Sequence, residues 1–559
     1  MFLKGKTVIK SNKGENLLNR KGLAVGFVLL LFVSSSFVGV SNQQKEVTIE
    51  KPCITPVGSS MNFIWPLYGH DAQNTCQSEY AAGQNEGYDK WKYFIAHGTP
   101  DLVVPVIDSN GTLYTTSFLD GLYVINSNGT LRWHRELYAY IEYQPVIGQD
   151  GTIYVGTIKR FQAFYPNGTL KWVLPIEKNF CCDPVISPNG TVYVGTDDGY
   201  LFAVNPNGTI QWQYYLGYSL NGASLDSQGK IYLSARYCDY LCCLFPNGTL
   251  HWTFRTIVDT SDAPLIGKDG TIYTVPTYDV IGINPDGTEK WRTPVSGAGR
   301  SPSLSPNGSI IYSSHDSGDV VCMDPNDGHI LWSYNIGLDP LSKSRATVSS
   351  DGMIFFAYTD KPGHLAYLCA LNPDGSLRWT SDITSDVPHY YGVNIGPAPS
   401  IGADGTVYIT TWFSSDDPIY HDFGYVHAFG QLDPNAPSPP TITGNSQGKI
   451  GEQYKYTLMS TSPLAKDIYY YIQWGDDSYT NWTGPFRSGE PLNVNHSWEK
   501  WGTYTVRARA RDIDNRWGPW GILTIKMPLS YNLLNKSFWE TLFERFPNAF
   551  PFLRYLFEK

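Results

Sequence analysis

The stretch YLFAVNPNGTIQW, residues 200–212, places the turn Asn-Pro-Asn-Gly between two apolar runs, and Trp212 follows Gly208 by four positions. Asn-Gly between alternating apolar runs is the strongest short-range signal for a β-hairpin, because both central positions of a type I′ turn need positive φ angles. The stretch therefore predicts two antiparallel strands joined by a tight turn.

The same hairpin recurs along the chain. Seven turn glycines are each followed four residues later by a tryptophan, and Gly87 stands in the same relation to Trp91 near the N-terminus. A second signature, PVIxxxGTxY, alternates with the hairpins, and its eight glycines run from Gly111 to Gly405 with a mean period of (405 − 111)/7 = 42 residues. Two hairpins per period predict four short strands per repeat, which is one blade of a β-propeller.

The repeated tryptophans are expected to pack between neighbouring blades rather than to stack on a ligand. The last PVI-type unit has no tryptophan hairpin after it, so the strand around Trp91 is predicted to complete the eighth blade. The expected fold class is therefore all-β, an eight-bladed β-propeller closed by strands from both of its ends. The predicted blade-docking residues are Trp91, Trp133, Trp172, Trp212, Trp252, Trp291, Trp332 and Trp379.

These motifs resemble a known family. WPLYGHDAQNT, residues 65–75, and the repeats of the form DGTIYVGT…LFAVNPNGTIQW are similar to PQQ-like repeat propellers, over roughly residues 65–430. That family includes quinoprotein dehydrogenases and non-enzymatic relatives such as the lipoprotein of the outer-membrane barrel-assembly machinery. The resemblance implies the fold but not a reaction, because cofactor-free members share the same repeat.

Beyond a proline-rich linker, alternating strands with regular turns predict a small Ig-like β-sandwich. IQWGDDS and HSWEKWGTYTVRARARD are similar to polycystic-kidney-disease (PKD) domains, although Asp477 stands where that turn usually has a glycine. Arg507, Arg509 and Arg511 alternate with small apolar residues, which indicates a solvated basic face; a strip that contacts glycans or anions is the alternative.

The N-terminus and the C-terminal tail both contain apolar segments, and these predict where in or outside the cell the protein is located. Six Lys or Arg residues and one Glu precede the apolar run Leu23–Val40, which predicts either an export signal cleaved after Ser41 or an uncleaved anchor. No cysteine follows at a lipoprotein cleavage position, and the aromatic tail is a second apolar handle, so we expect an extracellular protein held at the cell surface. The predicted organisation is a signal peptide or anchor over residues 1–41, a lead-in over 42–84, the propeller over 85–430, the linker over 431–443, the sandwich over 444–528 and the tail over 529–559.

Nine cysteines and ten Asn-x-Ser/Thr sequons fit an exported protein. Cys53 and Cys76 flank the segment before the repeats and are the best candidates for a disulfide. Seven sequons are Asn-Gly-Thr/Ser in predicted turns, where turn chemistry alone selects the same sequence. The candidates for N-glycosylation are Asn110, Asn128, Asn167, Asn189, Asn207, Asn247, Asn307, Asn481, Asn495 and Asn535.

No catalytic constellation is predicted. Resemblance to quinoprotein alcohol dehydrogenases draws attention to Cys181-Cys182, because those enzymes carry an adjacent-cysteine disulfide against their cofactor. Cys242-Cys243 falls on strand positions of the repeat, however, so cysteine is interpreted here as a small buried residue. GNSQG, residues 444–448, is not a nucleophile elbow, because it precedes a strand-like region rather than a helix.

One loop, WFSSDDPIYHDFG, gathers His421 with Asp416, Asp417 and Asp422, and is interpreted as solvated rather than as a cation site. The net charge of −10 without a basic cluster gives no reason to expect a nucleic-acid partner, and none is predicted.

The leading prediction is an exported, non-catalytic surface protein. Its propeller would bind or scaffold a protein or glycan partner, with the sandwich as a spacer or binding module and no cofactor. The alternatives are an oxidoreductase that depends on PQQ and calcium, and a surface protein that binds or processes carbohydrate.

Overall fold

The computed structural model describes residues 64–95, 103–118, 120–137, 140–141, 143–256, 262–276, 278–295, 301–314, 317–337, 340–360, 365–384, 392–414, 423–476 and 478–528. These residues form strands and turns and contain no helix. The predictions for the run Leu23–Val40, for Cys53, for the loop around His421 and for the aromatic tail lie outside them. No helix among the described residues is long and apolar enough to span a membrane.

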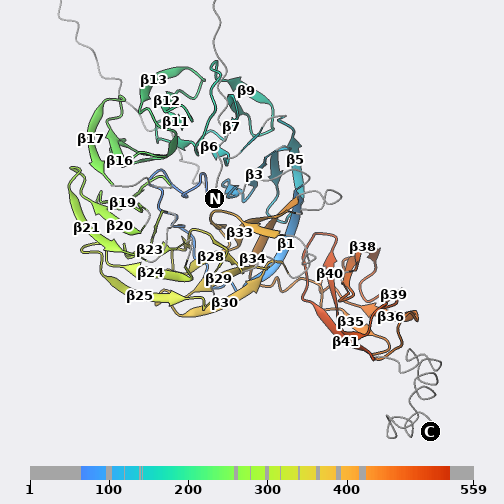
Figure 1. Cartoon of the computed structure of the whole chain (residues 1–559). Coiled ribbons are helices and arrows are strands. Elements are labelled where there is room, and N and C mark those ends of the chain that lie inside the picture. The colour runs from blue at the N-terminus through green and yellow to red at the C-terminus, as the bar shows by residue number, and fades with distance from the viewer. Residues whose placement is uncertain are drawn as a thin grey trace, which may run out of the picture. The chain divides into compact units, whose positions relative to one another are not determined.

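Residues 88–430 form a series of antiparallel sheets of four or five strands, each following the last in the chain (Figure 1). The first sheets are β2 (Val106–Ile107), β3 (Leu113–Ser117), β4 (Gly121–Ile125) and β5 (Leu131–Arg135); β6 (Val146–Ile147), β7 (Ile153–Thr157), β8 (Arg160–Phe164) and β9 (Leu170–Val173); β10 (Val185–Ile186), β11 (Val192–Gly195), β12 (Tyr200–Val204) and β13 (Ile210–Tyr215); β14 (Leu220–Leu225), β15 (Ile231–Ala235), β16 (Tyr240–Leu244) and β17 (Leu250–Arg255). The remaining sheets are β18 (Leu265–Ile266), β19 (Ile272–Thr274), β20 (Asp279–Ile283) and β21 (Glu289–Pro294); β22 (Ser303–Leu304), β23 (Ile310–Ser313), β24 (Asp319–Met323) and β25 (Ile330–Asn335); β26 (Ser342–Lys343), β27 (Thr347–Val348), β28 (Ile354–Thr359), β29 (Ala366–Leu371) and β30 (Leu377–Asp382); and β31 (Gly392–Ile395), β32 (Ser400–Ile401), β33 (Val407–Ser414) and β34 (Phe423–Gly430) with β1 (Tyr88–Ile95).

The stretch YLFAVNPNGTIQW, residues 200–212, forms the hairpin β12–β13, with Ala203 opposite Trp212. Gly208 at its turn has a φ angle of 85°, a left-handed conformation that glycine adopts without steric cost. The same glycine also lies against the ring of Trp172 from the preceding sheet, where a β-carbon would come within 2.8 Å of that ring. The turn glycine is therefore required by the backbone and by the contact between sheets.

Each repeated tryptophan lies over the turn glycine of the next sheet along the chain. The contacts join Trp91 to Gly129, Trp133 to Gly168, Trp172 to Gly208, Trp212 to Gly248, Trp252 to Gly287, Trp291 to Gly328, Trp332 to Gly375 and Trp379 to Gly87. Most of these indoles also donate a hydrogen bond to a backbone carbonyl of the neighbouring turn, as Trp91 does to Ser127 at 2.9 Å. The last contact, between Trp379 and Gly87, links the sheet of β30 to the residue just before β1.

β1 pairs antiparallel with β34 along its whole length, from Tyr88 opposite Gly430 to Ile95 opposite Gly424. This is the pairing that the motif around Trp91 predicts. Trp91 is 2% exposed and packs 5.8 Å from the ring of Tyr408 in β33. An N-terminal strand therefore forms the edge of the last sheet.

The lead-in that precedes β1 follows the inner strands of the ring, where Figure 1 shows it in blue. Its backbone carbonyls accept hydrogen bonds from the short first strands of successive sheets, beginning with the pairing of Trp65 and Ile107. Arg345, just before β27, is 1% exposed and donates both to the side chain and carbonyl of Asn74 in the lead-in and to the carbonyl of Pro302, just before β22. The donating amides belong to Ile107, Ile147, Leu225, Ile266, Leu304 and Val348.

The C-terminal domain, Thr441–Met527, contains two antiparallel sheets. One is β35 (Thr441–Thr443), β36 (Tyr454–Met459) and β39 (Leu492–His496), and the other is β38 (Tyr479–Phe486), β37 (Ile468–Gln473), β40 (Gly502–Asp512) and β41 (Gly521–Met527). Tyr456, Ile472, Trp498 and Val506 belong to one buried cluster that draws on both sheets. Alternation along these strands therefore buries one face of each sheet.

Lys343 carries a buried amino group that gives the fold a pH dependence. The side chain is 1% exposed, lies over the ring of Phe356, and donates to the carbonyl of Asp319. Burial lowers the pKa of Lys343 from 10.5 to about 7, although Asp319 and Cys369 act in the opposite direction. The folded protein thus releases this proton above pH 7, whereas the unfolded chain keeps it up to about pH 10.

Replacing Lys343 with Met is expected to stabilise the protein, because it removes the cost of keeping a charge buried. That cost is largest below pH 7 and disappears towards pH 10, so the gain should shrink by about 1.4 kcal/mol for each pH unit between these limits. Urea unfolding of both forms at pH 7, 8 and 9 measures the gain. A gain that stays constant over this range, or that the exposed Lys455→Met reproduces, contradicts the assignment.

Candidate functional site

β1 contains a β-bulge at the point where it contacts the C-terminal domain. Asp89 pairs with Phe429 and Trp91 with Ala428, so Lys90 is an extra residue in the ladder. A bulge leaves its extra residue unpaired and bends the strand. Here the carbonyl and the carboxylate of Asp89 both accept hydrogen bonds from Arg509 of β40.

Arg509 is 1% exposed, and its guanidinium group lies wholly within the contact. Its Nη1 donates to Oδ2 of Asp89 at 2.8 Å, Nη2 donates to the carbonyl of Asp89, and Nε donates to the carbonyl of Gly518 at 2.6 Å. The rings of Trp517 and Trp520 lie 4.8 and 5.6 Å from the guanidinium carbon. The charge is thus paired and covered by aromatic faces, which is what a buried cation requires.

Asn515 makes a second bridge between the domains. It has a φ angle of 63° in the turn between β40 and β41, and its Nδ2 donates to the carbonyl of Asn128 at 2.6 Å. Its Oδ1 accepts from Arg511 at 2.7 Å and from Trp517 at 2.9 Å. One amide therefore joins the first propeller sheet to the β40–β41 turn.

Arg516 anchors the same turn to the linker. Its Nε lies 3.3 Å from Oδ2 of Asp433, and its Nη1 lies 2.8 Å from carboxylate oxygens of Asp512 and Asp514. The hydrogen bond from Arg516 lowers the pKa of Asp514, and the two carboxylates raise that of Arg516.

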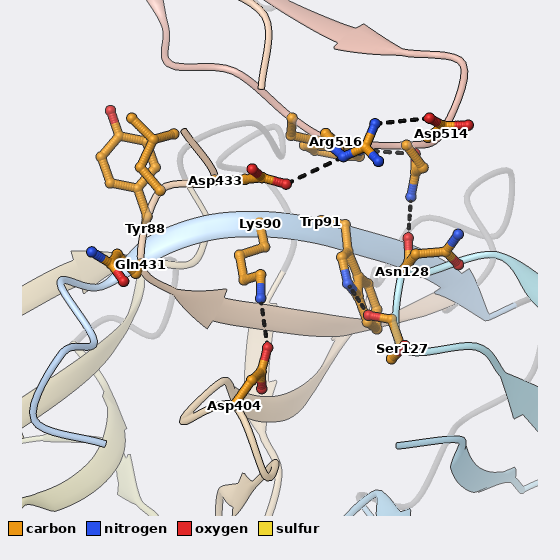
Figure 2. Close-up of a pocket in the computed structure, with 13 residues that line it drawn as sticks. Tyr88, Lys90, Trp91, Ser127, Asn128, Asp404, Gln431, Asp433, Asp514 and Arg516 are labelled. Carbon is orange, nitrogen blue, oxygen red and sulfur yellow. Dashed lines mark hydrogen bonds and ion pairs between the residues drawn. The ribbon is translucent and has the colours of Figure 1, made fainter. Parts of the chain in front are cut away.

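A cavity of about 550 Å³ lies along these contacts (Figure 2). Figure 2 shows the Lys90 side chain extending from β1 towards Asp404, while Asp433 and Arg516 lie on the opposite side of that strand. Pockets of this size often form where domains meet. The lining residues are Tyr88, Lys90, Trp91, Ser127, Asn128, Asp404, Gln431, Leu432, Asp433, Asp514, Asn515, Arg516 and Trp517.

Lys90 and Asp404 neutralise one another at the base of the cavity. The Lys90 ammonium lies 2.9 Å from Oδ2 of Asp404 and 2.8 Å from the hydroxyl of Thr406. Burial acts to raise the pKa of Asp404, but the charge and hydrogen bond of Lys90, together with the hydrogen bonds from Thr406, outweigh it, and the net pKa is lowered. The carboxylate therefore stays ionised near neutral pH.

The arginine strip of β40 is not the solvated face that its alternation predicts. Arg509 is buried against the propeller, and Arg511 lies 4.6 Å from the ring of Trp482 with its pKa lowered by burial. Arg507 lies 5.4 Å from the ring of Trp520. The interpretation missed this because the aromatic partners come from other strands and turns.

The cysteines separate into two settings. Cys181 and Cys182 lie in the loop between β9 and β10, as free thiols, where Cys181 lies 3.1 Å from the carbonyl of Leu220. Cys242 and Cys243 are buried in β16, as the repeat predicts, and burial raises the pKa of both to about 12. Such thiols stay protonated and unreactive at neutral pH.

Cys76 is fully buried, with its sulfur 3.7 Å from the hydroxyl of Thr347, and forms no disulfide with any described cysteine. Its expected partner, Cys53, lies outside the described residues, so the disulfide stays a prediction.

The sequon turns are held by the chemistry of their own side chains. Oδ1 of Asn207 accepts from the amide of Thr209 at 3.1 Å and from its hydroxyl at 2.7 Å. Asp286 accepts from Thr288 in the same way, at 3.0 and 2.6 Å, without forming a sequon. Turn geometry thus accounts for these sequences, and glycosylation of the ten asparagines stays a prediction.

A group of possible metal ligands lies in the turn after β24. Ligand atoms of Asp324, Asp327 and His329 come within 4.8 Å of one another. Asp327 accepts from the amide of His329 at 3.1 Å and contacts its ring, which raises the pKa of His329. These contacts belong to the turn itself and do not define a site.

Sequence reasoning did not identify Asp89, Lys90, Asn515 or Arg516 as parts of one site. A bulge leaves no clear sequence mark, and RDIDNRW reads as an ordinary polar turn. The one available signal was the concentration of arginine and tryptophan between residues 507 and 520.

Comparison with known proteins identifies the family of this chain. The family model described as outer membrane protein assembly factor BamB matches residues 80–275 and again residues 219–415, which together are more than half of the chain. The chain belongs to this family of PQQ-like repeat β-propellers. Membership accounts for the series of antiparallel sheets over residues 88–430.

Solved structures give more distant likenesses. BamB from Moraxella catarrhalis is 18% identical, over 61% of this chain and 97% of that chain, with a TM-score of 0.47. The PKD domain of an M14-like peptidase from Thermoplasmatales archaeon SCGC AB-540-F20 is 46% identical, over 17% of this chain and 97% of that chain, with a TM-score of 0.17. A protein of unknown function from Bacteroides caccae is 14% identical, over 49% of this chain and 94% of that chain, with a TM-score of 0.32. No curated protein matches the chain.

The Nη donors of Arg345 and the carboxylate of Asp71, both beside the lead-in, are already engaged by the protein rather than free for the PQQ that a quinoprotein resemblance implies. A tricarboxylate quinone with calcium needs free cationic donors and carboxylate ligands. Among the described residues next to the lead-in, the Nη donors of Arg345 are taken by Asn74 and by the carbonyl of Pro302. Asp71 accepts two hydrogen bonds from Thr75.

Proposed function

We propose that this protein is an exported, non-catalytic platform at the cell surface, in which an eight-bladed propeller over residues 85–430 binds or scaffolds a partner. Its C-terminal domain is a PKD-type, Ig-like module. The module is fixed to the propeller rather than acting as a loose spacer.

The observation that carries this proposal is the buried contact between Arg509 and β1. A spacer needs only a linker, whereas this contact covers a full guanidinium charge and orders two tryptophan rings. Ordering these groups costs conformational entropy that a flexible tether would avoid. A fixed second domain suits a protein that presents one composite surface to a partner.

Two further features support the proposal. The tryptophan contacts run from Trp91 to Gly129 and return from Trp379 to Gly87, which favours a ring of eight blades without a gap. Burial raises the pKa of Cys242 and Tyr154 to about 12, so these groups stay protonated and have low reactivity at neutral pH. Among the described thiols only that of Cys181 has a lowered pKa, because of its hydrogen bond with Cys182, and it is half-buried with its sulfur on the carbonyl of Leu220.

The alternative of a quinone-dependent oxidoreductase has a direct test. Full-length protein incubated with PQQ and Ca²⁺ and then desalted should retain no quinone absorbance and give no dye-linked oxidation of alcohols or aldoses. The matched control is the same protein after heating past its melting temperature, which reports adventitious retention of quinone. Turnover above that control would contradict the proposed platform function.

A further inference from the structure

The cavity at the junction has the properties of a small-molecule site. Its volume of about 550 Å³ lies within the range of about 300–1,000 Å³ typical of such sites. Its walls come from both domains and from the linker between them, so it exists only when the C-terminal domain is docked. Figure 2 shows polar side chains of several kinds along this cavity, on both sides of β1.

The charges of the cavity are already paired. Lys90 is held by Asp404 at 2.9 Å, and Arg516 is held by Asp433 and Asp514 at 3.3 and 2.8 Å. A phosphate, sulfate or metal ion would have to break one of these pairs to bind. A neutral ligand can instead accept from the ammonium or the guanidinium group and donate to the carboxylate that is paired with it, without separating the pair.

Uncharged groups supply further hydrogen bonds at one end. Tyr88 lies opposite Gly430 at the start of β1, and Gln431 follows Gly430 directly, so the two side chains border the same part of the cavity. Within the described residues, the phenol of Tyr88 and the amide of Gln431 make no hydrogen bond. Together these two groups offer hydrogen-bond donors and acceptors beside the aromatic ring of Tyr88.

We propose that this cavity binds a neutral, hydroxyl-rich ligand, a short uncharged sugar chain, between β1 and the β40–β41 turn. Hydroxyl groups both donate and accept, which matches the mixed carboxylate, amide and cationic lining. The apolar face of a sugar ring suits the ring of Tyr88. This assignment rests on the proposed platform function, for which it names the ligand class.

Full-length protein is tested on an array of neutral and acidic oligosaccharides, and hits are measured by titration calorimetry. We expect neutral sugars to bind, and Tyr88→Ala and Gln431→Ala each to weaken binding about tenfold, as expected for one or two lost contacts. The matched controls are Tyr215→Ala and Gln228→Ala, two exposed residues elsewhere on the propeller, and they should leave binding unchanged.

Three results overturn the assignment: no binding of any neutral sugar, preference for acidic sugars, or equal loss in the control variants. Thermal melts of all four variants show whether a loss of binding reflects loss of fold. Failure to bind sugar in a protein that also lacks quinone turnover would reject the ligand class and leave the platform function standing. Quinone turnover would reject the platform function independently.

Discussion

Deletion of residues 85–98 is expected to abolish stable folding of the propeller at ordinary temperature. The deletion removes β1, which pairs with β34 along seven residue pairs, and leaves β34 as an open edge. It also removes Trp91, and Gly87 on which Trp379 packs. Loss of one buried tryptophan alone costs about 3–5 kcal/mol, against a total stability of about 5–15 kcal/mol for a typical domain.

Calorimetry and limited proteolysis measure this effect. Trp91→Ala should lower the melting temperature clearly, whereas Trp501→Ala, a tryptophan 67% exposed in the C-terminal domain, should change it little. A synthetic peptide of residues 85–98 added to the deleted protein should restore part of the stability by pairing with β34. A deleted protein that melts like the full chain would contradict closure by β1.

The propeller could be predicted from the sequence because its signals are local and repeated. The turn glycines, the tryptophans four positions later and the PVIxxxGTxY units each act within one hairpin, and the repeat places them in space. The pairing of β1 with β34 also followed, because the incomplete last unit required a strand and Trp91 supplied it.

The junction could not be predicted in the same way. Asp89 and Arg509 are 420 positions apart, and nothing in their local sequences relates them. The alternation of Arg507, Arg509 and Arg511 correctly indicates a face of β40, but period alone does not say whether another domain covers that face. The rings of Trp482, Trp517 and Trp520 cover this face, through contacts that form only in the folded chain.

The structural role of the lead-in could not be predicted from the sequence either. Its motif, WPLYGHDAQNT, served in the sequence only as a family resemblance, yet its backbone carbonyls bond to the inner strands of several sheets. Backbone hydrogen bonds between a loop and strand edges depend on no side-chain pattern. Such a role therefore leaves little trace in composition or spacing.

Replacement of Asp89 by Ala is expected to release the C-terminal domain from the propeller. The substitution leaves the guanidinium of Arg509 buried with only backbone carbonyls as acceptors, and breaking a buried ion pair in this way typically costs about 3–5 kcal/mol. Asp89→Asn, which keeps an acceptor but not the charge, should cost less. Asp239→Ala is the matched control, because its partner Arg255 is 67% exposed and such surface pairs are worth only about 0–1 kcal/mol.

The double-mutant cycle with Arg509→Met separates docking from general destabilisation. If the two side chains stabilise the junction through each other, the double variant should be more stable than Asp89→Ala alone, because no uncompensated charge remains buried. Proteolysis within linker residues 431–440 reports undocking directly, since those residues lie against the same contact through Asp433. Equal cleavage in Asp89→Ala and Asp239→Ala, or strictly additive effects in the cycle, would show that the propeller and the C-terminal domain are joined by other contacts.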